Sequence, residues 1–150
     1  MKPSEHIPAL TWSIPVAAVG LIADEEQGPG GGIALKAYRC PAGVWTIGLG
    51  ETDGVKAGQV CTEAQAWEML RADIEKRAAS VRAACTRDPG PNELGAMVSL
   101  HYNIGGAAFA SAYAVLGDVR VVVLTQPDRS NTLMALPGEI ERLQGERSSQ

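Results

Sequence analysis

The stretch Leu35-Lys-Ala-Tyr-Arg-Cys-Pro-Ala-Gly-Val-Trp-Thr-Ile-Gly-Leu49 decides the fold. Leu35–Arg39 and Val44–Leu49 read as two short strands, and Cys40-Pro-Ala-Gly43 between them has proline and glycine in turn positions. The pattern therefore predicts a β-hairpin. Gln59–Cys61 is the candidate for a third strand.

Helical patterns lie on both sides of the hairpin. Pro15 to about Glu26 predicts one helix, with proline in the first turn, where its missing N–H costs nothing. The strongest pattern is Thr62–Cys85, which opens on a Thr-x-x-Gln capping box and repeats apolar residues at steps of three and four. Asn92–Ile104 predicts another helix, which ends at a Gly-Gly pair. Mainly helical segments around one hairpin indicate an α+β fold.

The two ends of the chain carry weaker patterns. Residues 1–13 contain two prolines and no periodicity, so we expect an irregular arm. Beyond residue 110, Val119–Thr125 resembles a strand and Pro137–Arg147 a thin amphipathic helix. Because no repeat, low-complexity tract or linker interrupts the sequence, the expectation is one domain over residues 1–150.

Composition excludes several functional classes. The 150 residues are 45% apolar and 20% charged, as in an ordinary soluble globular protein. A net charge of −4 argues against nucleic-acid binding, which needs clustered Lys and Arg to neutralise phosphates. The three cysteines form neither a disulfide framework nor a CxxC pair, and the two histidines are far apart. The sequence therefore predicts no metal site and a reducing cytoplasm as the place of synthesis.

The apolar run Ile14–Ala23 raises the question of a membrane or export segment. Its ten residues are too few to cross a bilayer, which takes about 20. Only Lys2 precedes it as a basic residue, and Asp24-Glu25-Glu26 follows at once. We interpret the run as a buried helix without membrane insertion; a secretory signal is the alternative.

The hairpin carries a family resemblance. Ala37-Tyr-Arg-Cys-Pro-Ala-Gly-Val-Trp-Thr-Ile-Gly-Leu-Gly-Glu-Thr52 resembles the pattern Ala-Tyr-x-Asp-x-x-Gly-x-Trp-Thr-Ile-Gly-Tyr-Gly-His-Thr of the phage-type lysozymes, or endolysins, of glycoside hydrolase family 24. Ser99-Leu-His-Tyr-Asn-Ile-Gly105 is similar to a second family motif that ends Asn-x-Gly. The resemblance covers roughly residues 15–110 and implies a lysozyme-like fold, mainly helical with a small hairpin lobe. Residues 111–150 form a diverged tail.

The resemblance also implies a catalytic site. The family places a Glu before an Asp, and a Thr six positions after that Asp; Cys40 and Thr46 keep this second spacing. The acid falls on Glu26, with Glu25 as the alternative, because the Gly-rich loop after this helix lengthens the first spacing. Cys40 stands where the family has a carboxylate. Tyr102 is expected to lie in the core or to line the cleft and contact substrate.

Two departures from the family pattern bear on activity. Glu51 replaces the family's His before Thr52, and the tail lacks the Trp-x-x-Ala-Gly-Gly and Gly-Leu-x-x-Arg-Arg-x-x-Glu patterns. Cys40 could act as a thiolate nucleophile, or assist a water that Thr46 orients. A lone cysteine in a turn is otherwise most often a small buried hydrophobe.

The function implied is that of an endolysin muramidase, a lysozyme-type glycoside hydrolase that cleaves the β-1,4 bond between N-acetylmuramic acid and N-acetylglucosamine. Its partner would be bacterial peptidoglycan. It would act as a monomer without cofactor, waiting in the host cytoplasm until a holin opens the way to the periplasm and wall. Two alternatives stay open: a weak or inactive peptidoglycan-binding remnant, and a lytic transglycosylase, which needs only the acid.

Overall fold

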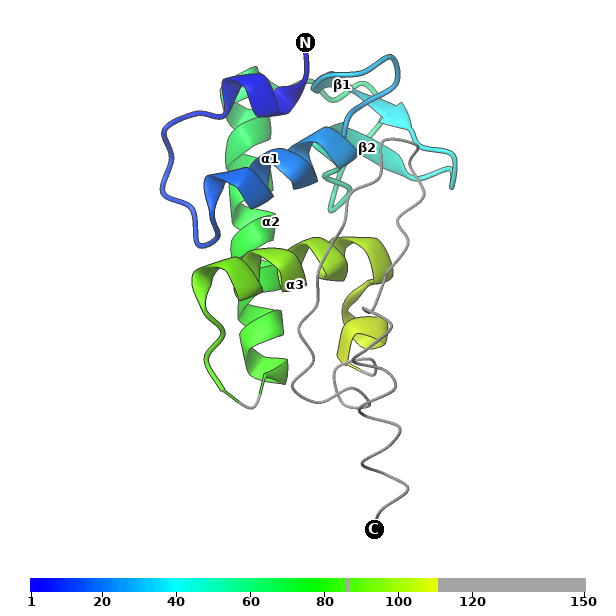
Figure 1. Ribbon diagram of the computed structural model, residues 1–150. Helices are drawn as coiled ribbons and strands as arrows, with labels where there is room; N and C mark the ends of the chain where they lie inside the picture. The colour runs from blue at the N-terminus through cyan, green and yellow to red at the C-terminus, as the bar shows by residue number, and fades with distance from the viewer. Residues whose placement is uncertain (86, 111–150) are drawn as a thin grey trace.

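The computed structural model describes residues 1–85 and 87–110, and its elements follow the predicted order. A short 3-10 helix, η1 (Pro3–His6), precedes α1 (Val16–Glu25). The hairpin follows as β1 (Ala34–Arg39) and β2 (Trp45–Gly48). The long α2 (Glu63–Ala84) and α3 (Pro91–Ile104) come next. Residues 106–110, the last described ones, are again helical. Figure 1 shows α1 and α3 lying across α2, with the hairpin near the C-terminal end of α1.

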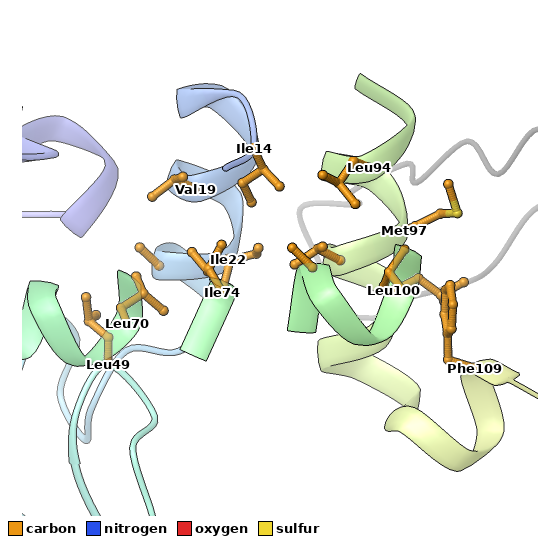
Figure 2. Close-up of a cluster of buried hydrophobic side chains, with 14 of the residues drawn as sticks. Ile14, Val19, Ile22, Leu49, Leu70, Ile74, Leu94, Met97, Leu100 and Phe109 are labelled. Carbon is orange, nitrogen blue, oxygen red and sulfur yellow. The ribbon is translucent and has the colours of Figure 1, made fainter. Parts of the chain in front are cut away.

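The helices bury one shared core. In α2 the residues that the periodicity predicts to be apolar face inward, and Ile74, Ala78 and Val81 have no exposed surface. They pack with the buried faces of α1 and α3, and with Leu49 just after β2 (Figure 2). Thr62 caps α2 as predicted: its hydroxyl accepts a hydrogen bond from the Gln65 amide at 3.2 Å. The core therefore ties the helices and the base of the hairpin into one unit.

The hairpin turn forms where proline and glycine predict it. The amide of Cys40 donates to the carbonyl of Val44 at 3.0 Å, and the amide of Gly43 donates to Cys40 at 2.8 Å. Gly43 has a φ of 79°, a left-handed conformation that favours glycine. Tyr38 pairs with Thr46 across the antiparallel ladder. Residues 59–61 do not form a full strand: Val60 makes an isolated bridge to Lys36, beside two backbone hydrogen bonds.

The N-terminal arm is more ordered than the sequence predicts. Ser4 donates two hydrogen bonds to the Asp24 carboxylate, from its amide at 2.9 Å and from its hydroxyl at 2.7 Å. Gly20 lets the arm approach α1 closely, since a side chain there would press on Ser4 and Ile7. These contacts join residues far apart in sequence, so local patterns could not reveal them. The predicted strand at 119–125 and the predicted helix at 137–147 lie outside the described residues.

Candidate active site

Glu26 occupies the C-terminal cap of α1. Its amide donates to the Ile22 carbonyl at 3.0 Å, which closes the last turn of the helix, and its side chain is half-buried. On the hairpin side, Gly50 lies so close that any side chain there would collide with the Glu26 carboxylate. Gly50 also has a φ of 83°, so both its backbone conformation and this close approach call for glycine.

The surroundings of Glu26 favour its protonated form. Burial is the largest effect and raises the pKa of the Glu26 carboxyl, since desolvation disfavours a charge. The positive charge of Arg77 opposes this rise, whereas Asp73 and Glu25 add to it. Glu25 itself is exposed, and Asp24 is turned to Ser4. Of the two candidate acids, Glu26 is therefore the one that is partly buried at the base of the hairpin.

Cys40 and Thr46 come together at the turn end of the hairpin. Cys40 is half-buried, whereas Thr46 is only 4% exposed. The Thr46 hydroxyl has one proton, which it can donate to the Val44 carbonyl at 3.2 Å or turn to the Cys40 sulfur. The pKa of the Cys40 thiol is lowered, first by the backbone amide of Val44 and further by the amide of Ala42 and the Thr46 hydroxyl. Donors around a sulfur stabilise the thiolate, which is the reactive form of cysteine.

Tyr38 connects the acid to the hairpin turn. It pairs with Thr46 across the ladder, two residues before Cys40 at the start of the turn. Burial raises the pKa of the Tyr38 phenol, and the charges of Cys40 and Glu26 raise it further. Tyr38 thus lies within electrostatic reach of both groups. This relation supports a single site that contains Glu26, Cys40 and Thr46.

Behind Glu26, α2 and α3 supply a polar cluster centred on Arg77. Its Nε donates to the Asp73 carboxylate at 2.8 Å, and Nη1 lies 3.2 Å from Nδ1 of His101. The guanidinium also stacks on the ring of Tyr102, with Cζ 3.9 Å from the ring centroid. Burial, followed by the charge of Asp73, raises the pKa of Tyr102 above its usual range.

The sequence left open whether Tyr102 lies in the core or lines the cleft, and the structure gives it features of both. Its side chain is half-buried, and its hydroxyl is enclosed without a hydrogen-bond partner among residues 1–85 and 87–110. The charge of Glu26 also acts on it, so it belongs to the surroundings of the candidate acid. Whether it contacts substrate stays a prediction.

Sequence reasoning missed Asp73, Arg77 and Gly50 as members of the site. Asp73 and Arg77 stand four residues apart on α2, a spacing that places them on one helix face. That spacing was available in the sequence. The spacing could not show that this face of α2 is directed toward Glu26, because the packing of α2 near the end of α1 is a tertiary contact.

The residues that the structure describes contain neither a cluster of metal ligands nor a membrane-spanning helix. No three His, Cys, Asp or Glu side chains gather there as a metal ion would need. Nor does any helix in that part of the chain have the length and apolar character to cross a bilayer.

Comparison with known proteins places these features in a family. The phage lysozyme family model matches residues 30–119, which is more than half of the chain. The endolysin of Acyrthosiphon pisum secondary endosymbiont phage 1 is 32% identical over 126 residues, covering 78% of this chain and 86% of the relative. The SAR-endolysin of Escherichia phage P1 is 34% identical over 89 residues, 56% of this chain and 46% of that protein.

Solved structures show the same relationship. The active form of the P1 phage endolysin Lyz aligns with a TM-score of 0.56 and 30% identity, over 64% of this chain and 52% of that one. The muramidase domain of SpmX from Asticaccaulis excentricus aligns with a TM-score of 0.59 and 26% identity, over 92% of this chain and 97% of the domain. The chain thus spans about half the length of the P1 endolysin and nearly all of the SpmX domain. The family match, the lysozyme-like α+β fold and the acid beside the hairpin agree, and the chain belongs to the phage lysozyme family of glycoside hydrolases.

Proposed function

We propose that the protein is an endolysin muramidase that hydrolyses the β-1,4 bond between N-acetylmuramic acid and N-acetylglucosamine in peptidoglycan. The observation that carries this proposal is the environment of Glu26, a half-buried carboxyl with a raised pKa beside the hairpin that holds Cys40 and Thr46. Glycoside hydrolysis requires a carboxylic acid that keeps its proton until it reaches the leaving oxygen.

In the first step Glu26 donates its proton to the glycosidic oxygen while the bond to the anomeric carbon breaks. The electron pair of that bond leaves with the oxygen, which becomes the hydroxyl of the departing sugar. Glu26 is left as a carboxylate. The oxocarbenium-like centre at the anomeric carbon then needs a nucleophile from the hairpin side.

Cys40 is the group that we propose completes the reaction. The amides of Val44 and Ala42 and the Thr46 hydroxyl favour its thiolate, which can take a proton from the attacking water. Because Thr46 is almost fully buried, we assign it the role of stabilising the Cys40 sulfur rather than that of contacting the water directly. Direct attack of the thiolate on the anomeric carbon is the competing route.

The test is loss of turbidity of chloroform-permeabilised Gram-negative cells, with products identified by mass spectrometry. Glu26→Gln should lower lysis by a factor of about 100 or more, because general acid catalysis contributes on this scale. Glu25→Gln is the matched control and should retain activity, since Glu25 is exposed. Loss of lysis in the control with lysis retained by Glu26→Gln would move the acid to Glu25.

The products separate the alternatives. Reducing muramic ends support the muramidase, whereas anhydro-muramic ends support a lytic transglycosylase, which uses the acid without a second group. A folded wild type that sediments with peptidoglycan but does not lyse cells would be the binding remnant that the diverged tail and Cys40 suggest.

Cys40→Asp tests the role of the second group. If Cys40 acts as a base, aspartate should keep activity within about tenfold, because a carboxylate can also accept the proton of water. If the thiolate attacks carbon, this variant should be far less active although folded.

The biological setting follows from the same proposal. The protein would act as a monomeric single domain, reaching the wall from the host cytoplasm when a holin permeabilises the membrane. Lysis of intact cells only when a holin is co-expressed would support this order, whereas lysis without a holin would contradict it.

A further inference from the structure

We propose that Arg77 is a positioning residue for the acid: Asp73, His101 and Tyr102 hold its guanidinium near Glu26 while keeping it out of an ion pair with that carboxyl. The inference rests on the proposed role of Glu26 as the proton donor. It adds a residue of α2 to the site.

Three separate contacts fix the guanidinium. Asp73 holds Nε at 2.8 Å, His101 lies 3.2 Å from Nη1, and the ring of Tyr102 covers one face at 3.9 Å. An arginine N–H can donate to Nδ1 of His101 only if this nitrogen carries no proton. Burial and the nearby charge of Arg77 both lower the pKa of His101, which agrees with a neutral imidazole.

The cluster lies behind the acid because of how α1 and α2 pack. Ile22 of α1 and Ile74 of α2 belong to the same buried core, drawn in Figure 2. Glu26 follows Ile22 by one helical turn, and Asp73 and Arg77 flank Ile74 on α2. The charges of Arg77 and Asp73 both act on the Glu26 carboxyl, with opposite sign.

This placement resolves a conflict in the chemistry of the acid. A cation paired directly with Glu26 would favour its carboxylate and remove the proton before substrate arrives. A site without any cation would leave the carboxylate unsupported once the proton has moved. No ion pair joins Glu26 to Arg77 within the described chain, because the guanidinium is bound to Asp73. The charge of Arg77 acts on the Glu26 carboxyl and can stabilise the carboxylate after proton transfer. Its ion pair with Asp73 keeps it from forming that carboxylate in advance.

The other titratable groups around Glu26 come from every neighbouring element. They are Glu25 on α1, Tyr38 on β1 with Cys40 beyond it, Asp73 on α2, and Tyr102 on α3. Burial raises the pKa of Glu26 most; among the charges of the described residues, Arg77 lowers it, whereas Asp73 and Glu25 raise it. Removing Arg77 and removing Asp73 should therefore shift this pKa in opposite directions.

The experiment titrates Glu26 by NMR in protein labelled with 13C at the glutamate carboxyl, with the signal assigned from its absence in Glu26→Gln. Arg77→Met should raise the pKa of Glu26 further, since a nearby cation that lowers it is lost. Asp73→Asn should lower it, because a negative charge is removed and the guanidinium becomes free to pair with Glu26. Arg71→Met is the matched control: Arg71 lies on the same helix, paired with Glu68, and its loss should leave Glu26 unchanged.

Opposite shifts in the two variants, with none in the control, would support the proposal. Arg77→Lys keeps the charge and should stay nearer to wild type than Arg77→Met, which separates an electrostatic effect from a packing defect. Unchanged titration of Glu26 in folded Arg77→Met would overturn the proposal, as would shifts in the same direction in Arg77→Met and Asp73→Asn. Turbidity assays on the same samples distinguish failure of the proposed function from failure of the proposed role of Arg77. Wild type without lysis would refute the proposed function. The titration would still test whether Arg77 acts electrostatically on Glu26.

Discussion

At the scale of single residues, the sequence could name the acid and the hairpin groups, because the family pattern fixes the spacing of Cys40 and Thr46. It could not rank Glu26 over Glu25 by environment. That ranking depends on burial, on Gly50, and on charges that α2 brings in from about fifty residues further along the chain. The roles of all three site residues remain proposals until the variants are measured.

The raised pKa of Glu26 has a consequence for stability. The folded state binds the Glu26 proton more tightly than the unfolded state, so stability falls as pH rises from the ordinary glutamate range through the folded pKa. Glu26→Gln removes this loss, so it should raise the free energy of unfolding relative to wild type at pH 8, with a much smaller rise near pH 4. Urea unfolding at both pH values measures the difference, and an equal effect at both would contradict it.

The cysteines should differ in reactivity. Backbone amides and the Thr46 hydroxyl lower the pKa of Cys40, whereas burial raises the pKa of Cys61. Because the thiolate is the nucleophile, iodoacetamide at pH 7 should modify Cys40 before Cys61. Peptide mass spectrometry over a time course gives the order, and prior labelling of Cys61 would show that the donors around Cys40 do not act as inferred.

At the scale of elements, local patterns were sufficient where a helix or turn depends on its own residues. The capping box and the apolar stripe of α2 and the Pro-Gly turn of the hairpin are such cases, and the structure confirms them. Local patterns failed where order depends on a distant partner. The arm forms η1 because Ser4 reaches Asp24, and residues 59–61 make only a bridge although the sequence suggests a strand.

The cap of α2 can be tested directly. Thr62→Ala removes the hydroxyl that accepts from the Gln65 amide, and it should lower the free energy of unfolding by about 1 kcal/mol. Ser80→Ala on the exposed face of the same helix is the control and should change stability by less than about 0.5 kcal/mol. Chemical denaturation followed by circular dichroism compares them, and equal effects would argue that the cap is not the cause.

At the scale of the whole molecule, one core joins α1, α2, α3 and the base of the hairpin, which supports the proposal of a single domain. Ile74 of α2 is one of its fully buried residues (Figure 2). The hydrophobic stripe of α2 predicts that Ile74 is inside; the partners that enclose it follow only from the packing of α1 and α3.

Ile74→Ala should therefore weaken the molecule as a unit. Loss of this side chain should cost about 2–5 kcal/mol, through lost burial and the cavity left behind. Tryptophan fluorescence and helical circular dichroism should still report one coincident transition, because Trp67 and the helices share the core. Two separated transitions would show that the described fold is not one cooperative unit.

The anchored N-terminal arm bears on how the enzyme can be used as a reagent. Met1 lies near Gly32 of the Gly-rich loop, and Ser4 is bound to Asp24, two residues before the proposed acid. A tag or surface linker joined ahead of Met1 would emerge beside this loop. An attachment ahead of Met1 therefore needs a long, flexible spacer. Without it, a bulky fusion partner would break the hydrogen bonds between Ser4 and Asp24 or block access to the hairpin.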